Sequence, residues 1–422
     1  MTSINIPDGI PLIEDETFRT CLSLASINIP NGVTSIGDCA FEGCAFISID
    51  IPNSVTEIGN YAFCGCSSLA SVTIGDGVIS IGNNAFSQCP LLEDVSIGDS
   101  VTIIGANAFN DCSKLTSIVI PNGVKSIGQL AFQDCKSLKS IIIPEGVKHL
   151  EKQTFCFCES LESVSLPTSL ISIGDNVFYQ CTSLTEIIIP DGVESIGSQC
   201  FCFCSSLQNV LLPEMLSSIN SEVFQDCIAL NNISIPDNVT LIDRQAFAGC
   251  ETLTTITIGN TVTSIGDAAF DYCLALQTLE IPNSVTSIGS GAFGYCPSLV
   301  DISLGDGLEA IGDGAFQYCP AIPSLIFPDG VTSIGNHAFL GCESLSEIVI
   351  GSSMSSIGED AFFNCVSLNN VTCKATTPPT LGVNAFYNIS PTAELLVHSG
   401  YMDVYANSEW SPYFAGIGEQ DF

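Results

Sequence analysis

The sequence predicts a β-rich solenoid built from stacked units of 23 residues. Three observations support this fold class: a phenylalanine at a fixed spacing, a strand-like alternation before each turn, and a cysteine at a fixed distance after most of the phenylalanines. The phenylalanine recurs from Phe18 to Phe386 in sixteen intervals, of which fourteen are 23 residues. A period in this range is typical of solenoids, in which each unit buries its apolar face against its neighbours.

Each unit contains two extended segments separated by a turn. In one unit, the apolar residues Ile118 and Ile120 alternate with residues that face outward. This alternation predicts a strand over residues 118–120. Pro121-Asn122-Gly123 predicts a turn, and residues 124–127 predict a short second strand. Ala131-Phe132 is expected to begin a helical or 3-10 turn. Stacking of equivalent strands then predicts a long parallel sheet.

A glycine recurs four residues before the repeat phenylalanine. Its substitutes include Asn220 and Asp243, the residue types that best tolerate a left-handed backbone. We therefore predict a positive φ at this position, with Glu151 as an exception that this reasoning does not explain. The glycines are Gly37, Gly59, Gly82, Gly105, Gly128, Gly174, Gly197, Gly266, Gly289, Gly312, Gly335 and Gly358.

The chain is strongly acidic and has no membrane-span pattern. It has 9 Lys and Arg against 45 Asp and Glu in 422 residues, a formal net charge of −36. Such a chain repels phosphates, so nucleic acid is not an expected partner. Its apolar residues are periodic, with no run of the ~18–20 residues that a membrane span needs. We expect one solenoid domain over residues 1–390, with about 16–17 repeats, and a C-terminal cap over residues 391–422.

The cysteines fall into two groups. Sixteen of the 22 lie three residues after the repeat phenylalanine, and we interpret them as buried small apolar thiols rather than a disulfide framework. Several of the other six are expected to be accessible, which weakly favours a reducing setting. Their C-x-C pairs lie on different repeats, too far apart to converge on zinc. These six are Cys39, Cys64, Cys156, Cys200, Cys202 and Cys373.

Enzyme chemistry has little support in the sequence. The three histidines, His149, His337 and His398, do not accompany a nucleophile and a carboxylate in a recognisable motif. We therefore expect no enzyme activity, no catalytic residues, no bound metal and no cofactor; a hydrolase is kept only as a remote alternative.

Two departures from the repeat pattern mark candidate partner-binding residues. The residue between the two strand isoleucines should face outward, and it is polar in many repeats but apolar in others. Clustered exposed apolar residues suggest a binding strip, although ordinary strand propensity explains them equally well. In addition, six of the nine basic residues fall between 114 and 152. The candidate residues are Lys125, Lys148, Lys139, Val119, Ile142, Ile188 and Leu211.

The repeat resembles the BspA-like leucine-rich repeat family. The pattern C-x-S-L-x-x-I-x-I-P-x-x-V-x-x-I-G-x-x-A-F stands nearly intact in residues 135–155 and 273–293, and the resemblance extends to about residue 390. The segment Thr377-Pro378-Pro379 and the aromatic residues Tyr405 and Trp410 are similar to the family's C-terminal cap. The resemblance implies a leucine-rich-repeat solenoid and roles in adhesion or protein interaction at the surface of bacteria and protists. It implies no catalytic residues.

We therefore expect a non-enzymatic interaction or adhesion scaffold with a protein or extracellular-matrix partner. The alternative is a structural protein that self-assembles end to end, as a homo-oligomer through the open N-terminal strand edge. The family resemblance implies a cell-surface or extracellular location. Residues 1–7 lack the basic and apolar regions of a signal peptide, so a cytoplasmic location stays open.

Overall fold

A computed structural model describes residues 2–422 and shows two compact units, Met1–Met215 and Leu216–Phe422. Each unit is a parallel β-solenoid in which most repeats contribute a first strand, a turn and a shorter second strand. Equivalent strands pair in register about one repeat apart, as in Ser71↔Asp94 and Ser264↔Ser287. The fold class predicted from the sequence is therefore confirmed.

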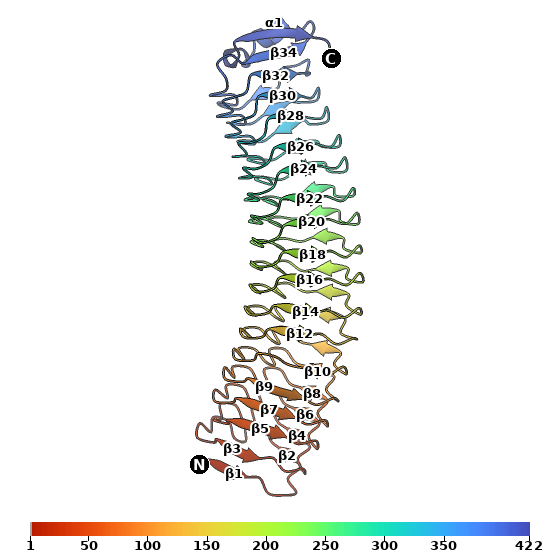
Figure 1. Ribbon diagram of the computed structural model, residues 1–422, viewed down its shortest axis with the longest axis vertical. Coiled ribbons are helices and arrows are strands. Elements are labelled where there is room, and N and C mark those ends of the chain that lie inside the picture. The colour runs from red at the N-terminus through yellow and green to blue at the C-terminus, as the bar shows by residue number, and fades with distance from the viewer. Residues whose placement is uncertain (1) are drawn as a thin grey trace. The chain divides into compact units, whose positions relative to one another are not determined.

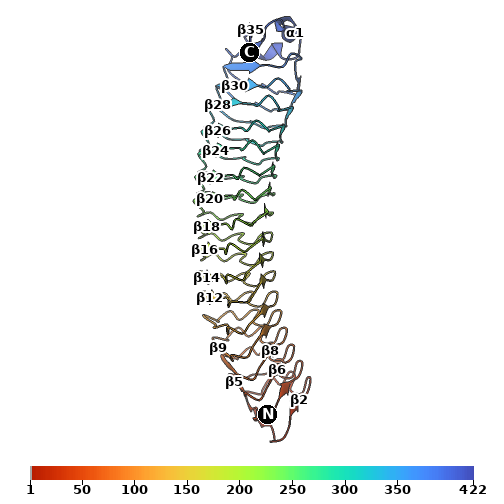
Figure 2. The same ribbon diagram turned by 90° about the vertical axis from the view of Figure 1, so that its right-hand side faces the viewer.

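In the N-terminal unit, the two strands of each repeat form two separate rows (Figures 1 and 2). The first row comprises β1 (Ser3–Asn5), β3 (Ser26–Asn28), β5 (Ser48–Ile51), β7 (Ser71–Ile74), β9 (Asp94–Ile97), β12 (Ser140–Ile142), β14 (Ser163–Ser165), β16 (Glu186–Ile188) and β18 (Asn209–Leu211). The second row comprises β2 (Leu12–Ile13), β4 (Ser35–Ile36), β6 (Glu57–Ile58), β8 (Ser80–Ile81), β10 (Ile103–Ile104), β11 (Ser126–Ile127), β13 (His149–Leu150), β15 (Ser172–Ile173) and β17 (Ser195–Ile196).

The C-terminal unit repeats this plan. Its first row comprises β20 (Asn232–Ser234), β22 (Thr255–Thr257), β24 (Thr278–Glu280), β26 (Asp301–Ser303), β28 (Ser324–Ile326), β30 (Glu347–Ile350), β32 (Asn370–Cys373), β34 (Glu394–His398) and β35 (Gly416–Gln420). Its second row comprises β19 (Ser218–Ile219), β21 (Leu241–Ile242), β23 (Ser264–Ile265), β25 (Ser287–Ile288), β27 (Ala310–Ile311), β29 (Ser333–Ile334), β31 (Ser356–Ile357) and β33 (Thr380–Leu381).

The first row of the N-terminal unit is divided into short ladders rather than one long sheet. β1 pairs with β3, β5 and β9 both pair with β7, β12 pairs with β14, and β16 pairs with β18. The repeat around Val119 contributes only an isolated bridge, Ser117↔Ser140, where a strand was predicted. The second row is more continuous, because β2, β4, β6, β8, β10 and β11 form one six-stranded sheet.

The repeat phenylalanines form a stacked column inside each unit. Neighbouring rings lie 5.1–5.7 Å apart between centroids, and most pairs are nearly parallel. From Phe41 to Phe362 the rings are fully buried. The column accounts for the 23-residue period, because each ring packs against the ring of the next repeat.

The cysteines that follow these phenylalanines are buried and free, as predicted, except for half-buried Cys21. Their thiols also have a hydrogen-bond role that the sequence did not reveal. Most of these thiols donate to the backbone carbonyl of the phenylalanine in the preceding repeat; the Cys181 Sγ to Phe155 O distance is 3.3 Å. Burial raises the pKa of the Cys181 thiol well above its ordinary value.

Of the other six cysteines, only Cys39 and Cys64 are half-exposed, so the expectation of several accessible thiols holds for these two alone.

The prediction of a positive φ at the recurring glycines is wrong. None of the twelve glycines, nor Asn220, Asp243 or Glu151, has a positive φ among residues 2–422. At these glycines the backbones of neighbouring repeats approach closely, although Asn220, Asp243 and Glu151 carry a Cβ at the same position. A Cβ atom on Gly289 would lie 2.6 Å from the backbone N of Asp267 and the backbone C of Gly266. Glu151 therefore needs no special backbone conformation.

The positive φ values occur instead in the turn on either side of the phenylalanine. Gln153 and Phe157, for example, have φ of 59° and 61°. This orientation lets their N–H groups donate to carbonyls of the next repeat, at 2.9 Å to Asp175 and 2.8 Å to Tyr179. The expected helical turn is thus a non-helical turn hydrogen-bonded along the stack. Within the part of the chain that the structure describes, helix is confined to α1 (Met402–Ala406) and the 3-10 helix η1 (Ser411–Tyr413).

The C-terminal residues cover the last phenylalanine of the column. Trp410 and Tyr405 are fully buried, and the Trp410 ring lies 5.3 Å from that of Phe386. The Trp410 indole N–H donates to the Pro379 carbonyl at 2.8 Å, and the Tyr405 hydroxyl donates to the Ala375 carbonyl at 2.8 Å. These aromatic residues close the apolar core at this end.

Candidate interaction surface

The predicted apolar residues lie on the outward face of the first row in the N-terminal unit. Their side chains remain highly exposed: 80% for Val119, 70% for Ile142, 71% for Ile188 and 65% for Leu211. We call these four residues the aliphatic column. Their neighbours in each strand, such as Ile141 and Ile187, point into the core and are buried. The strand alternation therefore fixes the outward direction of the column.

The aliphatic column consists of two pairs. Val119 and Ile142 belong to consecutive repeats, and Ile188 pairs directly with Leu211 between β16 and β18. The repeat between the two pairs carries Ser165, which is in register with Ile142. Adjacent repeats are spaced by roughly 4.8 Å, so each pair presents a continuous apolar strip. An open hollow of about 390 Å³ lies beside Ile188, lined in part by Ser165 and Pro190.

The predicted lysines do not all share this face. Lys139 directly precedes β12, so it lies at the start of the strand that carries Ile142. Lys125 and Lys148 instead precede β11 and β13 in the second row. The structure therefore places Lys139 next to the aliphatic column and places Lys125 and Lys148 on a different side of the repeat.

Most lysines between residues 114 and 152 lack an ion pair, with Lys136 as the exception. Among residues 2–422, Arg19, Arg244, Lys136 and Lys374 form ion pairs with carboxylates. The five basic residues without such a partner all lie between 114 and 152, and all are exposed. They are Lys114, Lys125, Lys139, Lys148 and Lys152. In a chain of net charge −36, this segment therefore presents uncompensated positive charge.

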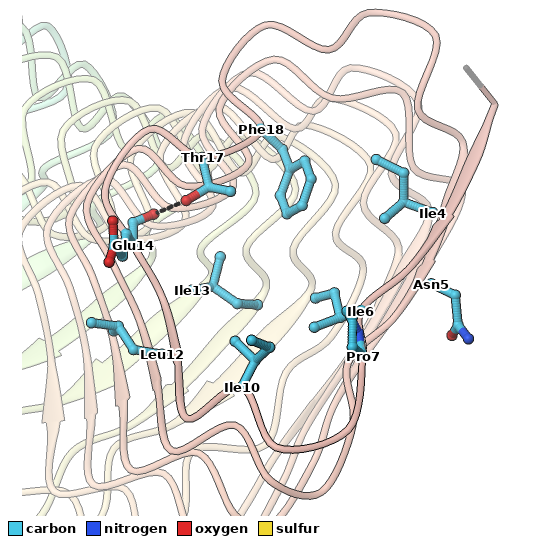
Figure 3. A pocket seen from close by; sticks show the side chains of 10 residues that line it. All are labelled: Ile4, Asn5, Ile6, Pro7, Ile10, Leu12, Ile13, Glu14, Thr17 and Phe18. Carbon is cyan, nitrogen blue, oxygen red and sulfur yellow. Dashed lines mark hydrogen bonds between the residues drawn. The ribbon is translucent and has the colours of Figure 1, made fainter.

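The N-terminal unit also has an apolar hollow on its first repeat (Figure 3). It has a volume of about 300 Å³ and is lined by Ile4, Ile6, Ile10, Leu12 and Phe18, among others. Phe18 stacks on Phe41 at 5.3 Å through one ring face and is only half-buried, unlike the phenylalanines that follow.

A third feature was not predicted, although the repeat register contains it. Tyr272, Tyr295 and Tyr318 occupy the same position in three consecutive repeats, two residues after the repeat phenylalanine. Their rings form an exposed stack on the C-terminal unit. Aligning the repeats on phenylalanine would have found this stack, but only the structure shows which ring faces are covered.

Within residues 2–422, no group of three or more His, Cys, Asp or Glu side chains is arranged to hold a metal ion. None of the helices in the described chain combines the length and apolar character that crossing a bilayer requires.

Comparison with known proteins identifies the family. A model of the BspA type leucine rich repeat region, in six copies, matches residues 1–116, 102–231, 217–342 and 309–407. A leucine-rich repeat protein from Bacteroides ovatus is 31% identical, with 89% of this chain and 92% of that chain covered and a TM-score of 0.74. A leucine rich cell surface protein from Faecalibacterium prausnitzii is 29% identical over 88% of both chains, with a TM-score of 0.43. No curated protein matches the chain. The matched regions cover most of the sequence, and the chain therefore belongs to the BspA-type leucine-rich repeat family.

Proposed function

We propose that this protein is a non-enzymatic interaction or adhesion scaffold of the cell-surface type. It binds a protein or extracellular-matrix partner through the aliphatic column of the N-terminal unit. The observation that carries this proposal is the 65–80% exposure of four large aliphatic side chains aligned on one face. Single exposed apolar residues are common on proteins, but exposed apolar side chains gathered on one face are typical of a binding surface.

The backbone beneath the aliphatic column favours binding at low entropic cost. β12 pairs with β14 and β16 pairs with β18, so the backbone that carries Ile142, Ile188 and Leu211 is fixed by interstrand hydrogen bonds. A surface that is already ordered loses little conformational freedom when a partner docks. Full burial of one valine or isoleucine side chain contributes roughly 1.5–3 kcal/mol.

The charges around the column indicate what the partner surface should look like. Lys139 at the start of β12 has no ion pair among the described residues and is exposed. An apolar patch with an acidic rim would therefore complement this face. Lys125 and Lys148 contribute to the same partner only if it extends around the turn to the second row.

The proposal is tested by binding to wells coated with reconstituted extracellular matrix. The double variant Val119→Ser, Ile142→Ser removes one pair of the column while keeping the backbone. The matched control is Ile326→Ser, because Ile326 is 67% exposed at the equivalent position of the C-terminal unit. We expect the double variant to bind at least about tenfold more weakly, since a loss of 1.4 kcal/mol already gives this factor. The control should bind like the parent chain.

Charge-reversal variants then map the edge of the surface. Lys139→Glu should weaken matrix binding, whereas Lys125→Glu, Lys148→Glu should do so only for a partner that reaches the second row. If the parent chain, the Val119→Ser, Ile142→Ser variant and the Ile326→Ser control bind equally well, the aliphatic column is not the binding site.

End-to-end self-assembly is a second candidate, favoured by the apolar hollow of Figure 3. A second copy docking there would cover the half-buried ring of Phe18 and the exposed Ile10 and Leu12. Light scattering over a range of concentrations tests this function. Oligomers that Leu12→Glu dissociates would support it, and a strict monomer would exclude it.

A further inference from the structure

One contact between consecutive repeats of the N-terminal unit is closed on one side only. We call the contact between two consecutive repeats a step. At the step between β14 and β16 the first-row strands do not pair, although β12 pairs with β14 and β16 pairs with β18. The second-row strands of the same two repeats, β15 and β17, do pair, at Ser172↔Ser195 and Ile173↔Ile196. The first row is therefore open at this step, and the second row is closed.

The missing pairing leaves backbone donors without acceptors at the open step. At the preceding step, the N–H groups of Glu162 and Ile143 each donate to a carbonyl of the facing repeat, at 2.8 and 3.0 Å. The equivalent residues of the open step are Thr185 and Leu166, and neither N–H has an acceptor among residues 2–422. Segments whose backbone hydrogen bonds are missing are the ones that open at the lowest free energy.

An open hollow marks the same step. It has a volume of about 390 Å³, and both repeats line it, with Ser163 and Ser165 of β14 on one side and Glu186 and Ile188 of β16 on the other. A second hollow, of about 320 Å³, lies where β9 and the segment of Val119 do not pair. Both hollows therefore occur where the first row is open.

The open step lies between the two pairs of the aliphatic column. Val119 and Ile142 precede it, and Ile188 and Leu211 follow it. The repeats of the first pair are joined by the bridge next to Val119, and those of the second pair by the pairing of β16 with β18. A small rotation about the closed second row would therefore move one pair relative to the other.

We propose that the open step is a joint, which opens and closes on the first row, pivots on β15 and β17, and so sets the spacing between the two pairs of the aliphatic column. The inference rests on the proposed function only in treating the column as a binding surface. A partner that contacts both pairs would hold the joint at one spacing, because it would bind one arrangement of the pairs more tightly than the others. A partner that contacts a single pair would leave the joint free.

Ser163 and Glu186 allow the joint to be biased in either direction. They occupy equivalent outward positions on the two sides of the open step, and both are exposed. Opposite charges at facing positions of neighbouring strands stabilise their pairing, and like charges destabilise it. Ser163→Lys should therefore favour the closed joint, and Ser163→Glu should favour the open one.

Hydrogen exchange of the free protein, resolved to single amides by mass spectrometry, tests the joint. After correction for intrinsic rates, the amides of Thr185 and Leu166 should exchange at least about tenfold faster than those of Glu162 and Ile143. Ser163→Lys should slow the exchange of Thr185 and Leu166 by about two- to fivefold, and Ser163→Glu should not slow it.

Ser71→Lys is the matched control. It adds the same charge next to Asp94, but at a step whose first row is already paired, so the exchange of Thr185 and Leu166 should stay as in the parent chain. Slowing by this control as large as that by Ser163→Lys would overturn the proposal, because net charge alone would then explain the effect.

Two other results would also overturn the joint. One is equal protection of Thr185, Leu166, Glu162 and Ile143 in the parent chain, and the other is equal exchange in Ser163→Lys and Ser163→Glu. These measurements need no partner. Matrix binding that Val119→Ser, Ile142→Ser does not weaken would remove the proposed function and leave the joint in place, so the two failures can be told apart.

Discussion

Replacing one ring of the phenylalanine column tests how the repeats hold together. Phe270 is fully buried and stacks between Phe247 at 5.1 Å and Phe293 at 5.2 Å. A buried phenylalanine removes roughly 150–250 Å² from water, which at about 25 cal/mol per Å² corresponds to about 4–6 kcal/mol. Alanine keeps part of this burial, so Phe270→Ala should cost about 3–5 kcal/mol.

Phe18 provides the matched comparison because it has only one stacking partner and is half-buried. Phe18→Ala should therefore cost about half as much, on the order of 2 kcal/mol. The assay is native-state hydrogen exchange, since repeat arrays do not always unfold in one step. The amides of Phe270 and Phe247, which donate to Ala292 and Ala269, should lose protection in Phe270→Ala. Equal costs for the two variants would refute the stacked-column reasoning.

Three further predictions follow from the local geometry. Gly289→Ala should destabilise its repeat by about 1–3 kcal/mol in denaturant melts, because the added Cβ meets backbone. Gly291→Asn, at φ 63° with nothing near the added Cβ, should leave stability nearly unchanged. A larger loss of stability in Gly291→Asn than in Gly289→Ala would contradict the close approach as the reason for glycine at position 289. Burial raises the pKa of Asp271 from 3.8 to about 6, so its contribution to stability falls as pH rises through that range. Asp271→Asn should therefore raise the melting temperature near neutral pH but not near pH ~4, and it should do so more than the charge-matched Asp301→Asn. Burial, and then the neighbouring Glu42, raises the pKa of Cys39 to about 11. The Cys39 thiol of the native protein should therefore resist alkylation near pH ~8, because little of it is thiolate, and mass spectrometry of the alkylated protein would show this. Rapid labelling of that thiol would contradict this.

The sequence carried most of the information about the fold because stacking repeats one set of contacts. The 23-residue period of Phe18 to Phe386 predicted the solenoid and the buried cysteines. It could not explain the recurring glycine, because the atoms that exclude a Cβ at Gly289 belong to the preceding repeat. Nor could it locate the left-handed residues: Leu130 has φ of 61° because its N–H must reach Lys152 O, and its side chain gives no sign of this.

The candidate sites were predicted less completely. Outward alternation placed Val119 and Ile142 correctly on one exposed face. Clustering in the sequence did not mean clustering in space for the lysines, because Lys125 and Lys148 precede second-row strands.

The most direct test of the proposed function is photo-crosslinking from the aliphatic column. Benzoylphenylalanine replaces Ile142 or Ile188, and the protein is irradiated on a reconstituted extracellular matrix. Ile103, which is 47% exposed on the second row of the same unit, is the control position. Covalent adducts with one matrix protein are expected from both column positions and none from the control. Equal crosslinking from all three positions, or crosslinking from the control alone, would rule out the aliphatic column as the binding surface.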